Sequence, residues 1–186
     1  PELTGANIPF AVRARVCLLR DLGSALAPDN AFAIIQGLET VALRMKQHCE
    51  NAEKVVRFLK KHKEVIKVIY STEHDEHISN RAKQYLNGGN GPMVGIELKG
   101  GIEAGKKFIE SLKMFYHVAN IGDARSLAIH PATTTHSQLT EEELLAAGVT
   151  PGYVRLSIGI EHPDDIIADL KQALDASGKP SLKAVS

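Results

Sequence analysis

The longest regular feature of the chain is a stripe of apolar residues between residues 29 and 62. Its members step along by three and four residues, as on one face of an α-helix: Ile35, Leu38, Ala42, Met45, Cys49, Ala52, Val56 and Leu59. Residues 28–30, Pro-Asp-Asn, are a typical helix start. A coiled coil would need larger residues than Ala42 and Ala52 at its seam. The pattern therefore predicts one long helix over 29–62, packed closely against another element.

A shorter apolar segment, punctuated by arginines, precedes this helix over residues 8–22. Pro9 suits the first turn of a helix, and Gly23 with Ser24 is a typical end. The long helix and this segment carry more apolar surface than a small sheet can cover. We therefore expect the isolated chain to associate through exposed apolar patches.

After residue 62 the pattern becomes a mixture of strand and helix periods. Strands are predicted over 65–70, 93–99, 118–121, 126–129 and 154–158, and helices over 75–86, 102–112, 140–148 and 162–176. Elements in this order favour an α/β fold, with a small mixed sheet that carries helices on one face and is preceded by the long helix.

The strand over 154–158 has the clearest alternation. Tyr153, Arg155 and Ser157 alternate with apolar residues, which predicts one buried face and places Arg155 and Ser157 together on the other. A guanidinium on a rigid strand can hold a carboxylate through two parallel hydrogen bonds. The alternatives are an ordinary surface arginine and one that pairs with a neighbouring Asp or Glu.

Other candidate motifs favour structure over chemistry. His74 and His77 could share a helix face, but the closed ligand set of a structural zinc site is missing, so no metal site is predicted. Residues 88–91, Gly-Gly-Asn-Gly, precede a strand rather than a helix and predict a turn, not a phosphate cradle. His130, followed by a proline, is expected to shape the turn that carries Thr135, and Gly95 marks a close approach within a strand.

Composition narrows the class of partner. Lys+Arg and Asp+Glu both total 22, so the formal net charge is zero and nothing favours nucleic acid or an acidic membrane. No apolar run approaches the roughly 20 residues of a membrane span. Cys17 and Cys49 lie far apart in apolar helical patterns and are expected to be buried thiols in a reducing compartment. We expect a cytoplasmic protein.

The stretch over 118–161 resembles the C-terminal part of the Cys/Met-metabolism enzymes that use pyridoxal phosphate. In that family, an Asn or Ser before a Gly-Asp, a Thr in a Thr-His-Ser turn and an Arg in Val-Arg-Leu-Ser form the pocket for the substrate's α-carboxylate. The matching positions are Asn120, Thr135 and Arg155. The resemblance implies that these three residues bind the carboxylate, with Arg155 as the principal anchor.

The resemblance covers roughly residues 5 to 176, but only the C-terminal part of the family's length. It implies a fold-type I C-terminal domain over 63–178, the long connecting helix over 29–62, the tail end of the large cofactor domain over 1–28 and a loose tail over 179–186. The family's Ser-x-Thr-Lys, whose lysine holds the cofactor, does not occur here. No catalytic or cofactor-binding residue is therefore assigned to this chain. We expect a fragment or processed chain that is inactive alone and partners a missing N-terminal cofactor domain.

Two features favour the O-acetylhomoserine sulfhydrylase branch of the family. Residues 36–40 read Gln-Gly-Leu-Glu-Thr, where lyases and cystathionine synthases more often have Arg-Gly-Leu-Lys-Thr, and lyases tend to carry Ser at Asn120. The resemblance then implies γ-replacement by sulfide, giving homocysteine and acetate for methionine biosynthesis, in a homo-oligomer, a tetramer by family. The alternatives are a cystathionine or methionine γ-lyase or cystathionine γ-synthase of the same family, and a stand-alone amino-acid-binding module without catalysis.

Overall fold

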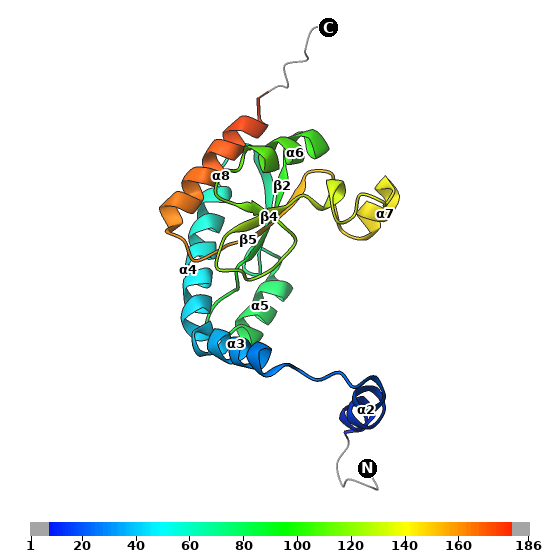
Figure 1. The fold of residues 1–186 in the computed structure, drawn as a ribbon. Coiled ribbons are helices and arrows are strands. Elements are labelled where there is room, and N and C mark those ends of the chain that lie inside the picture. The colour runs from blue at the N-terminus through cyan, green and yellow to red at the C-terminus, as the bar shows by residue number, and fades with distance from the viewer. Residues whose placement is uncertain (1–7, 180–186) are drawn as a thin grey trace. The chain divides into compact units, whose positions relative to one another are not determined.

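The structure, a computed structural model, describes residues 8–179. The loose tail predicted over 179–186 falls almost wholly outside the described residues. The chain divides into two compact units, Pro1–Val41 and Ala42–Ser186, and each is described here by itself. Figure 1 shows the course of the chain from one unit to the other.

The first unit is helical. Its first helical stretch joins α1 (Pro9–Arg13), a π-helical piece (Ala14–Leu19) and α2 (Arg20–Leu22), and it ends at Gly23 with a left-handed φ of 66°. Helix α3 (Pro28–Glu39) follows, with Pro28 in its first turn. None of residues 8–41 is buried. The predicted start at Pro9 and end at Gly23 are confirmed.

The prediction of one continuous helix over 29–62 is wrong. Helix α3 ends at Glu39, and Thr40, with φ −107° and ψ 3°, separates it from α4 (Val41–Leu59). Gly37 and the β-branched Thr40 both disfavour the helical state, so this is the weakest point of the segment. The apolar stripe continues across the break because periodicity reports which face is apolar, not whether the backbone is continuous. Only its second half is buried, from Cys49 onward.

The second unit is built on a five-stranded mixed sheet of order β1-β2-β5-β4-β3. Its strands are β1 (Val65–Ile69), β2 (Met93–Leu98), β3 (Tyr116–His117), β4 (Leu127–Ile129) and β5 (Tyr153–Ser157). Strand β5 lies at the centre, antiparallel to β2 and β4, and only β3 and β4 are parallel. The small mixed sheet of the sequence prediction is confirmed.

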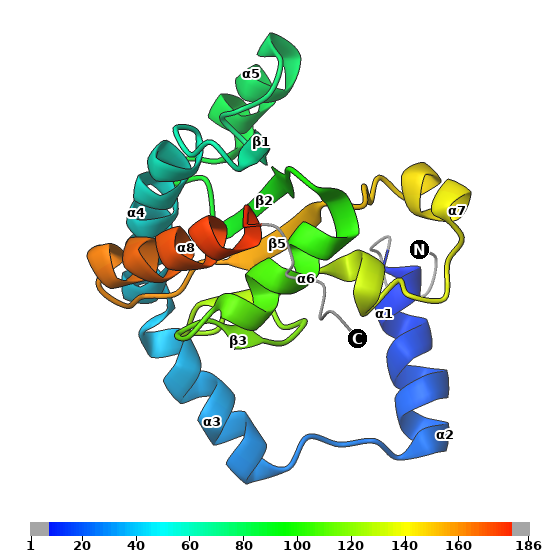
Figure 2. The same ribbon diagram turned by 90° about the horizontal axis from the view of Figure 1, so that it is seen from above.

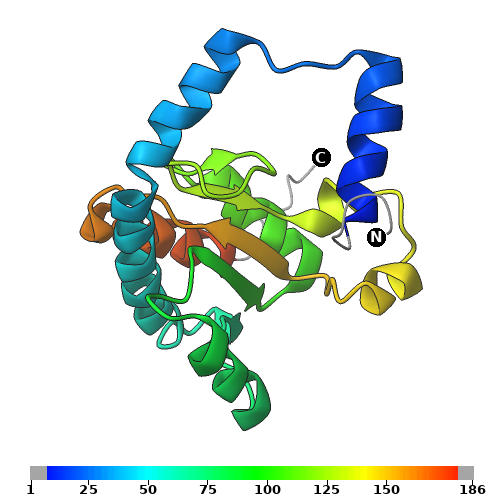
Figure 3. The same ribbon diagram turned by 90° about the horizontal axis from the view of Figure 1, so that it is seen from below.

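Helices cover one face of this sheet. They are α4, α6 (Gly101–Ser111) and α8 (Pro163–Ser177), and Figure 2 shows α6 and α8 lying over the strands. Figure 3, from the opposite side, shows β2 and β5 in front of those helices. The core between the two layers includes Val154 and Leu156 of β5 and Ile158 directly after it, all fully buried. Two further helices are α5 (Glu76–Tyr85) and α7 (Glu141–Ala146).

One predicted strand does not form. Residues 118–121 are a loop, and the strand of that region is β3, two residues earlier. The prediction over 118–121 is wrong because the loop's backbone groups bond to side chains of β5 instead of to a strand. The carbonyl of Ala119 and the amide of Gly122 are both used in this way. The predicted strands around β1, β2, β4 and β5 are confirmed to within one or two residues at each end.

Two further observations bear on the predicted environment of the chain. Cys17 is exposed, so its expected burial is wrong: its helical stretch has no buried residue, whereas Cys49 on α4 is buried. Across residues 8–179, no helix combines the length and apolar character needed to cross a membrane.

Candidate carboxylate-binding site

Arg155 lies on the face of β5 opposite to the helices. Its neighbours Val154 and Leu156 point into the core and are fully buried, so the strand is held firmly from behind. The side chain of Arg155 is half-buried, and its Nη2 donates a hydrogen bond to the carbonyl oxygen of Ala119 at 2.6 Å. Within residues 8–179, no carboxylate lies close enough to form an ion pair with Arg155. Its positive charge therefore faces a half-open surface with only a backbone carbonyl as partner.

The loop after β3 folds over this arginine and carries Asn120. Ser157, two residues beyond Arg155, accepts a hydrogen bond from the backbone N–H of Gly122 at 3.0 Å through its Oγ. Arg155 and Ser157 thus reach the same loop, which confirms that they share a face. Asn120 lies between the two attachment points, at Ala119 and Gly122, and is exposed. The structure therefore brings Arg155 together with the loop that carries Asn120.

Thr135 lies on the turn that follows β4, the other neighbour of β5. Ile129 at the end of β4 pairs with Arg155, and a single 3-10 turn (Pro131–Thr133) then leads to Thr135. Thr135 is exposed, and its hydroxyl is hydrogen-bonded to the Nδ1 of His136 at 2.8 Å. No hydrogen bond joins Thr135 to Arg155 in the described part of the chain. The topology places this turn after the strand that pairs with the strand of Arg155.

The residue that shapes this turn is His130, as the sequence predicted. Its buried ring bonds the Thr133 hydroxyl at 2.8 Å through Nδ1 and the carbonyl of Pro151 at 2.9 Å through Nε2. Burial lowers the pKa of His130, the charge of Lys106 acts in the same direction, and the bond to Pro151 opposes both. In the neutral ring, Nε2 donates and Nδ1 accepts. His130 ties the Thr135 turn to the segment that leads into β5.

A hollow of about 260 Å³ lies on the other side of Arg155, over β1 and β2. Its lining is mixed: Ile69, Tyr70, Ser71, His74, Met93, Val94, Gly95, Tyr153 and Arg155. The ring of Tyr153 covers Gly95, where an added Cβ would come within 2.7 Å of Cε2, so the predicted close approach at this glycine is confirmed. Burial raises the pKa of the Tyr153 hydroxyl, and the charge of Arg155 opposes that shift.

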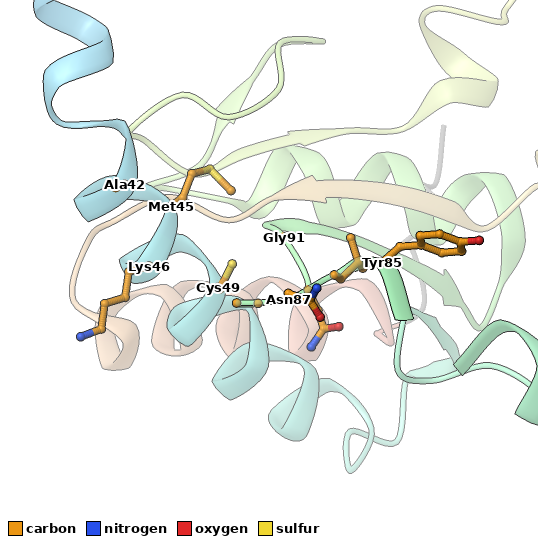
Figure 4. Close-up of a pocket in the computed structure, with 11 residues that line it drawn as sticks. Ala42, Met45, Lys46, Cys49, Tyr85, Asn87 and Gly91 are labelled. Carbon is orange, nitrogen blue, oxygen red and sulfur yellow. The ribbon is translucent and has the colours of Figure 1, made fainter. Parts of the chain in front are cut away.

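Figure 4 shows a larger hollow, of about 480 Å³, whose lining does not include Arg155. It is formed by the start of α4 and the loop before β2: Ala42, Met45, Lys46, Cys49, Tyr85, Leu86, Asn87, Gly88, Gly89, Asn90 and Gly91. Lys46 is the one charged residue in this lining. The glycine-rich segment forms a turn into β2, as predicted, and does not begin a helix. Size alone therefore does not identify the site, and the chemistry favours the surface around Arg155.

Metal ligands do not gather in the described residues. From residue 8 to residue 179, no group of three or more His, Cys, Asp or Glu side chains is arranged to hold an ion. His74 and His77 are both exposed at the start of α5.

The sequence matches a known family. The family model for the Cys/Met metabolism PLP-dependent enzymes matches residues 6–175. The chain belongs to this family. The match includes Asn120, Thr135 and Arg155 and nearly all of the described structure.

Individual relatives agree. The chain is 53% identical over 171 residues to the O-acetyl-L-homoserine sulfhydrylase of Leptospira meyeri, covering 91% of this chain and 39% of the relative. It is 47% identical to O-acetyl-L-homoserine sulfhydrylase 1 of Thermus thermophilus, covering 90% and 40%. An L-methionine gamma-lyase of Fusobacterium nucleatum is 44% identical, covering 91% and 43%. The chain thus spans about 40% of the length of these relatives.

A solved structure supports the fold assignment. A putative O-acetylhomoserine (thiol)-lyase from Campylobacter jejuni superposes with a TM-score of 0.83 at 45% identity, covering 93% of this chain and 41% of that one. That crystal structure holds an N'-pyridoxyl-lysine-5'-monophosphate. The α/β fold predicted from the sequence, a C-terminal domain of the fold-type I kind, is confirmed.

The residues around Arg155 do not themselves fit the cofactor. Pyridoxal phosphate is held in this family through a lysine, and the lining of the hollow beside Arg155 contains none. The donors present are a guanidinium, hydroxyls and backbone amides, which suit a carboxylate.

Proposed function

We propose that this chain is the C-terminal part of a pyridoxal-phosphate-dependent O-acetylhomoserine sulfhydrylase. The complete protein would convert O-acetylhomoserine and sulfide into homocysteine and acetate, a step of methionine biosynthesis. In the proposal, this chain contributes the pocket for the substrate's α-carboxylate. Arg155 is the main anchor, and Asn120 and Thr135 assist it.

The observation that carries the proposal is the unpaired charge of Arg155. A half-buried guanidinium that has no carboxylate partner within residues 8–179 is suited to take one from a ligand. The carbonyl of Ala119 occupies one N–H at Nη2 and fixes the direction of the planar group. The other N–H groups remain available for two parallel bonds to a carboxylate. An arginine that only stabilised the strand would be expected to have an Asp or Glu beside it.

The cofactor would be held by the rest of the protein. When bound, pyridoxal phosphate supplies the electron sink for chemistry at the amino acid's carbon atoms. The contribution of this chain is orientation: the carboxylate must be fixed so that the reacting bond has the right angle to the cofactor. An error of about 1 Å in such a position can cost on the order of 100-fold in rate.

The proposal extends to partners and location. We infer that the chain packs against an N-terminal cofactor domain and assembles with copies of itself, as a tetramer, in the cytoplasm. The large exposed apolar residues of the first unit, such as Phe10, Leu22 and Phe32, are consistent with further packing partners. Sedimentation of the complete protein tests the subunit number.

Turnover by the complete protein decides between this function and its main alternative. We expect homocysteine to form from O-acetylhomoserine and sulfide faster than methionine or cystathionine is consumed. The alternative, a γ-lyase of the same family, is favoured by the L-methionine gamma-lyase at 44% identity. Faster elimination from methionine or cystathionine than replacement on O-acetylhomoserine would establish the lyase instead.

We further propose that residues 1–186 alone are catalytically inactive, because no lysine of the family's Ser-x-Thr-Lys kind is present to hold the cofactor. The rival is a stand-alone module that binds amino acids without catalysis. Calorimetry separates the two. Amino-acid binding by the isolated chain with micromolar affinity would favour the module, and its absence would favour the fragment of an enzyme.

A further inference from the structure

We infer that Glu161 and Ser126 are positioning residues for the carboxylate site. They hold the loop whose Ala119 carbonyl orients the guanidinium of Arg155. The inference rests on the proposed function of Arg155 and goes beyond it, because neither residue is among those matched to the family's pocket. Neither side chain is proposed to touch the substrate.

The loop in question runs from residue 118 to residue 125. Its first half is attached to β5 at Ala119, by Arg155, and at Gly122, by Ser157. Asn120 lies between these attachments. The side chains of Val118, Asn120 and Ile121 are all exposed. The loop therefore has little hydrophobic anchorage of its own. Its position relative to the sheet must therefore be fixed by hydrogen bonds.

The second half of the loop is held by one carboxylate. The backbone N–H of Ser126 donates to Oε1 of Glu161 at 2.6 Å, and the Ser126 hydroxyl donates to Oε2 at 2.9 Å. The same hydroxyl accepts from the N–H of Gly159 at 2.9 Å. Ser126 is fully buried. Since a hydroxyl has one proton, this arrangement uses its only donor and needs both partners in place.

The segment that carries Glu161 is fixed in turn to the helical layer. Asn51 on α4 donates from Nδ2 to the carbonyls of Gly159, at 3.0 Å, and Glu161, at 2.8 Å. His48, one turn earlier, bonds the carbonyl of Ile158 at 2.6 Å through Nδ1. Both side chains are fully buried. The position of Glu161 is thus set by a rigid helix and by the strand that carries Arg155.

Gly159 shows how closely these parts fit. A Cβ at this position would lie 2.2 Å from Oε2 of Glu161 and 2.5 Å from the backbone nitrogen of Ser126. Another backbone bond, from the N–H of Ile160 to the carbonyl of Ala124 at 2.9 Å, closes the loop. Any side chain at Gly159 would push Glu161 away from Ser126. The segment after β5 is therefore packed closely against the loop that orients Arg155.

A conservative variant of the complete protein tests the inference. Glu161→Gln keeps the shape but replaces one acceptor by a donor facing the Ser126 hydroxyl. The probe is L-norleucine, compared by calorimetry with 1-aminopentane, the same molecule without its carboxylate. We expect the preference for the acid over the amine to fall by roughly tenfold, as for a shift of a fraction of an ångström. KM for the amino-acid substrate should rise with it, and the affinity for the amine should stay unchanged.

A matched control separates positioning from general destabilisation. Asp169 is also a buried carboxylate that accepts several backbone hydrogen bonds, but it lies on α8, in the helical layer. Asp169→Asn should lower the unfolding temperature and leave the acid-to-amine preference unchanged. If Glu161→Gln lowers the unfolding temperature without changing that preference, the inference is wrong.

The remaining outcomes are also informative. If Glu161→Gln does not fold, Ser126→Ala replaces it, because that variant keeps the backbone bond to Glu161 and loses only the hydroxyl; an unchanged preference there would also overturn the inference. If the unmodified protein shows no preference for the acid, the proposed carboxylate-binding role of Arg155 is itself wrong. A preference in the unmodified protein that Glu161→Gln retains in full refutes the positioning role alone.

Discussion

The two faces of strand β5 have opposite characters. Val154 and Leu156 lie on one face, fully buried under α6 and α8, and Ile158, the residue after the strand, continues this face. Arg155 and Ser157 lie on the other, and both hydrogen-bond to one loop. One short strand thus packs into an apolar core on one side, and on the other side bonds to a loop through a buried serine and a half-buried arginine.

The difference explains why an arginine here can be a precise ligand. A guanidinium holds a carboxylate well only if its own position is fixed. The apolar face fixes the backbone of β5 by close packing, and the loop of Ala119 fixes the end of the side chain. The helical face therefore contributes to recognition without touching a ligand, and we expect the half-buried Arg155 on the other face to contribute little to stability. This division can be tested by changing each face separately.

The largest effect on stability is expected from the core face. Leu156→Ala should lower the free energy of unfolding by about 2–5 kcal/mol, because it leaves a cavity between the sheet and the helices. Leu145→Ala on α7, where the side chain is 59% exposed, is the control and should cost well under 1 kcal/mol. Chemical denaturation of both variants measures the difference. Similar losses in the two would mean that β5 is not held from the helical side.

A smaller loss is expected from the helical layer's polar anchor. The carboxylate of Asp169 accepts hydrogen bonds from the backbone N–H groups of Lys113, Met114 and Phe115, at 2.8–3.3 Å. Asp169→Ala should cost about 2–3 kcal/mol, because buried donors lose a charged acceptor. The exposed Glu110→Ala serves as control, and thermal unfolding gives both values. If the Asp169 variant is fully folded under the assay conditions and still binds the amino acid more weakly, the two faces do not act separately.

On the open face, Thr135→Val should weaken amino-acid binding by about 1 kcal/mol, the net contribution of one neutral hydrogen bond. Stability should not change, because the Thr135 side chain is exposed and bonds only its neighbour His136 among the described residues. Calorimetry of the complete protein with L-norleucine measures the affinity. Thr134→Val, which removes a bond to the His130 carbonyl instead, should affect stability more than binding. The reverse pattern would exclude Thr135 from the site.

A further expected effect concerns the dependence of stability on pH. Burial keeps His130 neutral in the folded protein and lowers its pKa; Lys106 and His117 add to this, and the Pro151 bond and Glu97 oppose it. Below a pH of about 6.5, the unfolded chain therefore binds a proton that the folded one does not. Stability is complete above that pH and falls as pH drops toward the folded pKa, at most by about 1.4 kcal/mol per pH unit.

His130→Gln should flatten this slope, measured by denaturation at several pH values between about 5 and 8. The exposed His77→Gln should leave it unchanged. A wild-type slope that His130→Gln retains would show that another group causes it.

Much of the fold could be predicted because the signals are local. The alternation from Tyr153 to Ser157 indicated both the strand and its two faces, and the helical pattern over 140–148 indicated α7. The break at Thr40 could not be predicted from periodicity, since an apolar stripe continues through it. The loop over 118–121 was also missed, because its partners are side chains 35 residues or more away in sequence.

The candidate site was predicted only in part. Arg155 and Ser157 followed from alternation, whereas Asn120 and Thr135 came from the family resemblance. Glu161 and Ser126 were missed because their pairing spans 35 residues and neither stands in an unusual local pattern. The one signal that could have pointed to them was the glycine at 159, where a close approach excludes a side chain.

The most direct test of the account is a conservative change at Arg155 itself. In the complete protein, Arg155→Lys keeps the charge and loses the planar fork, and the exposed Arg57→Lys on α4 is the matched control. Calorimetry compares L-norleucine with 1-aminopentane in each. We predict that Arg155→Lys loses about 2 kcal/mol of its preference for the acid, roughly 30-fold, with folding unchanged, and that Arg57→Lys loses none. A preference that survives intact in Arg155→Lys would contradict the claim that this arginine binds the substrate's carboxylate.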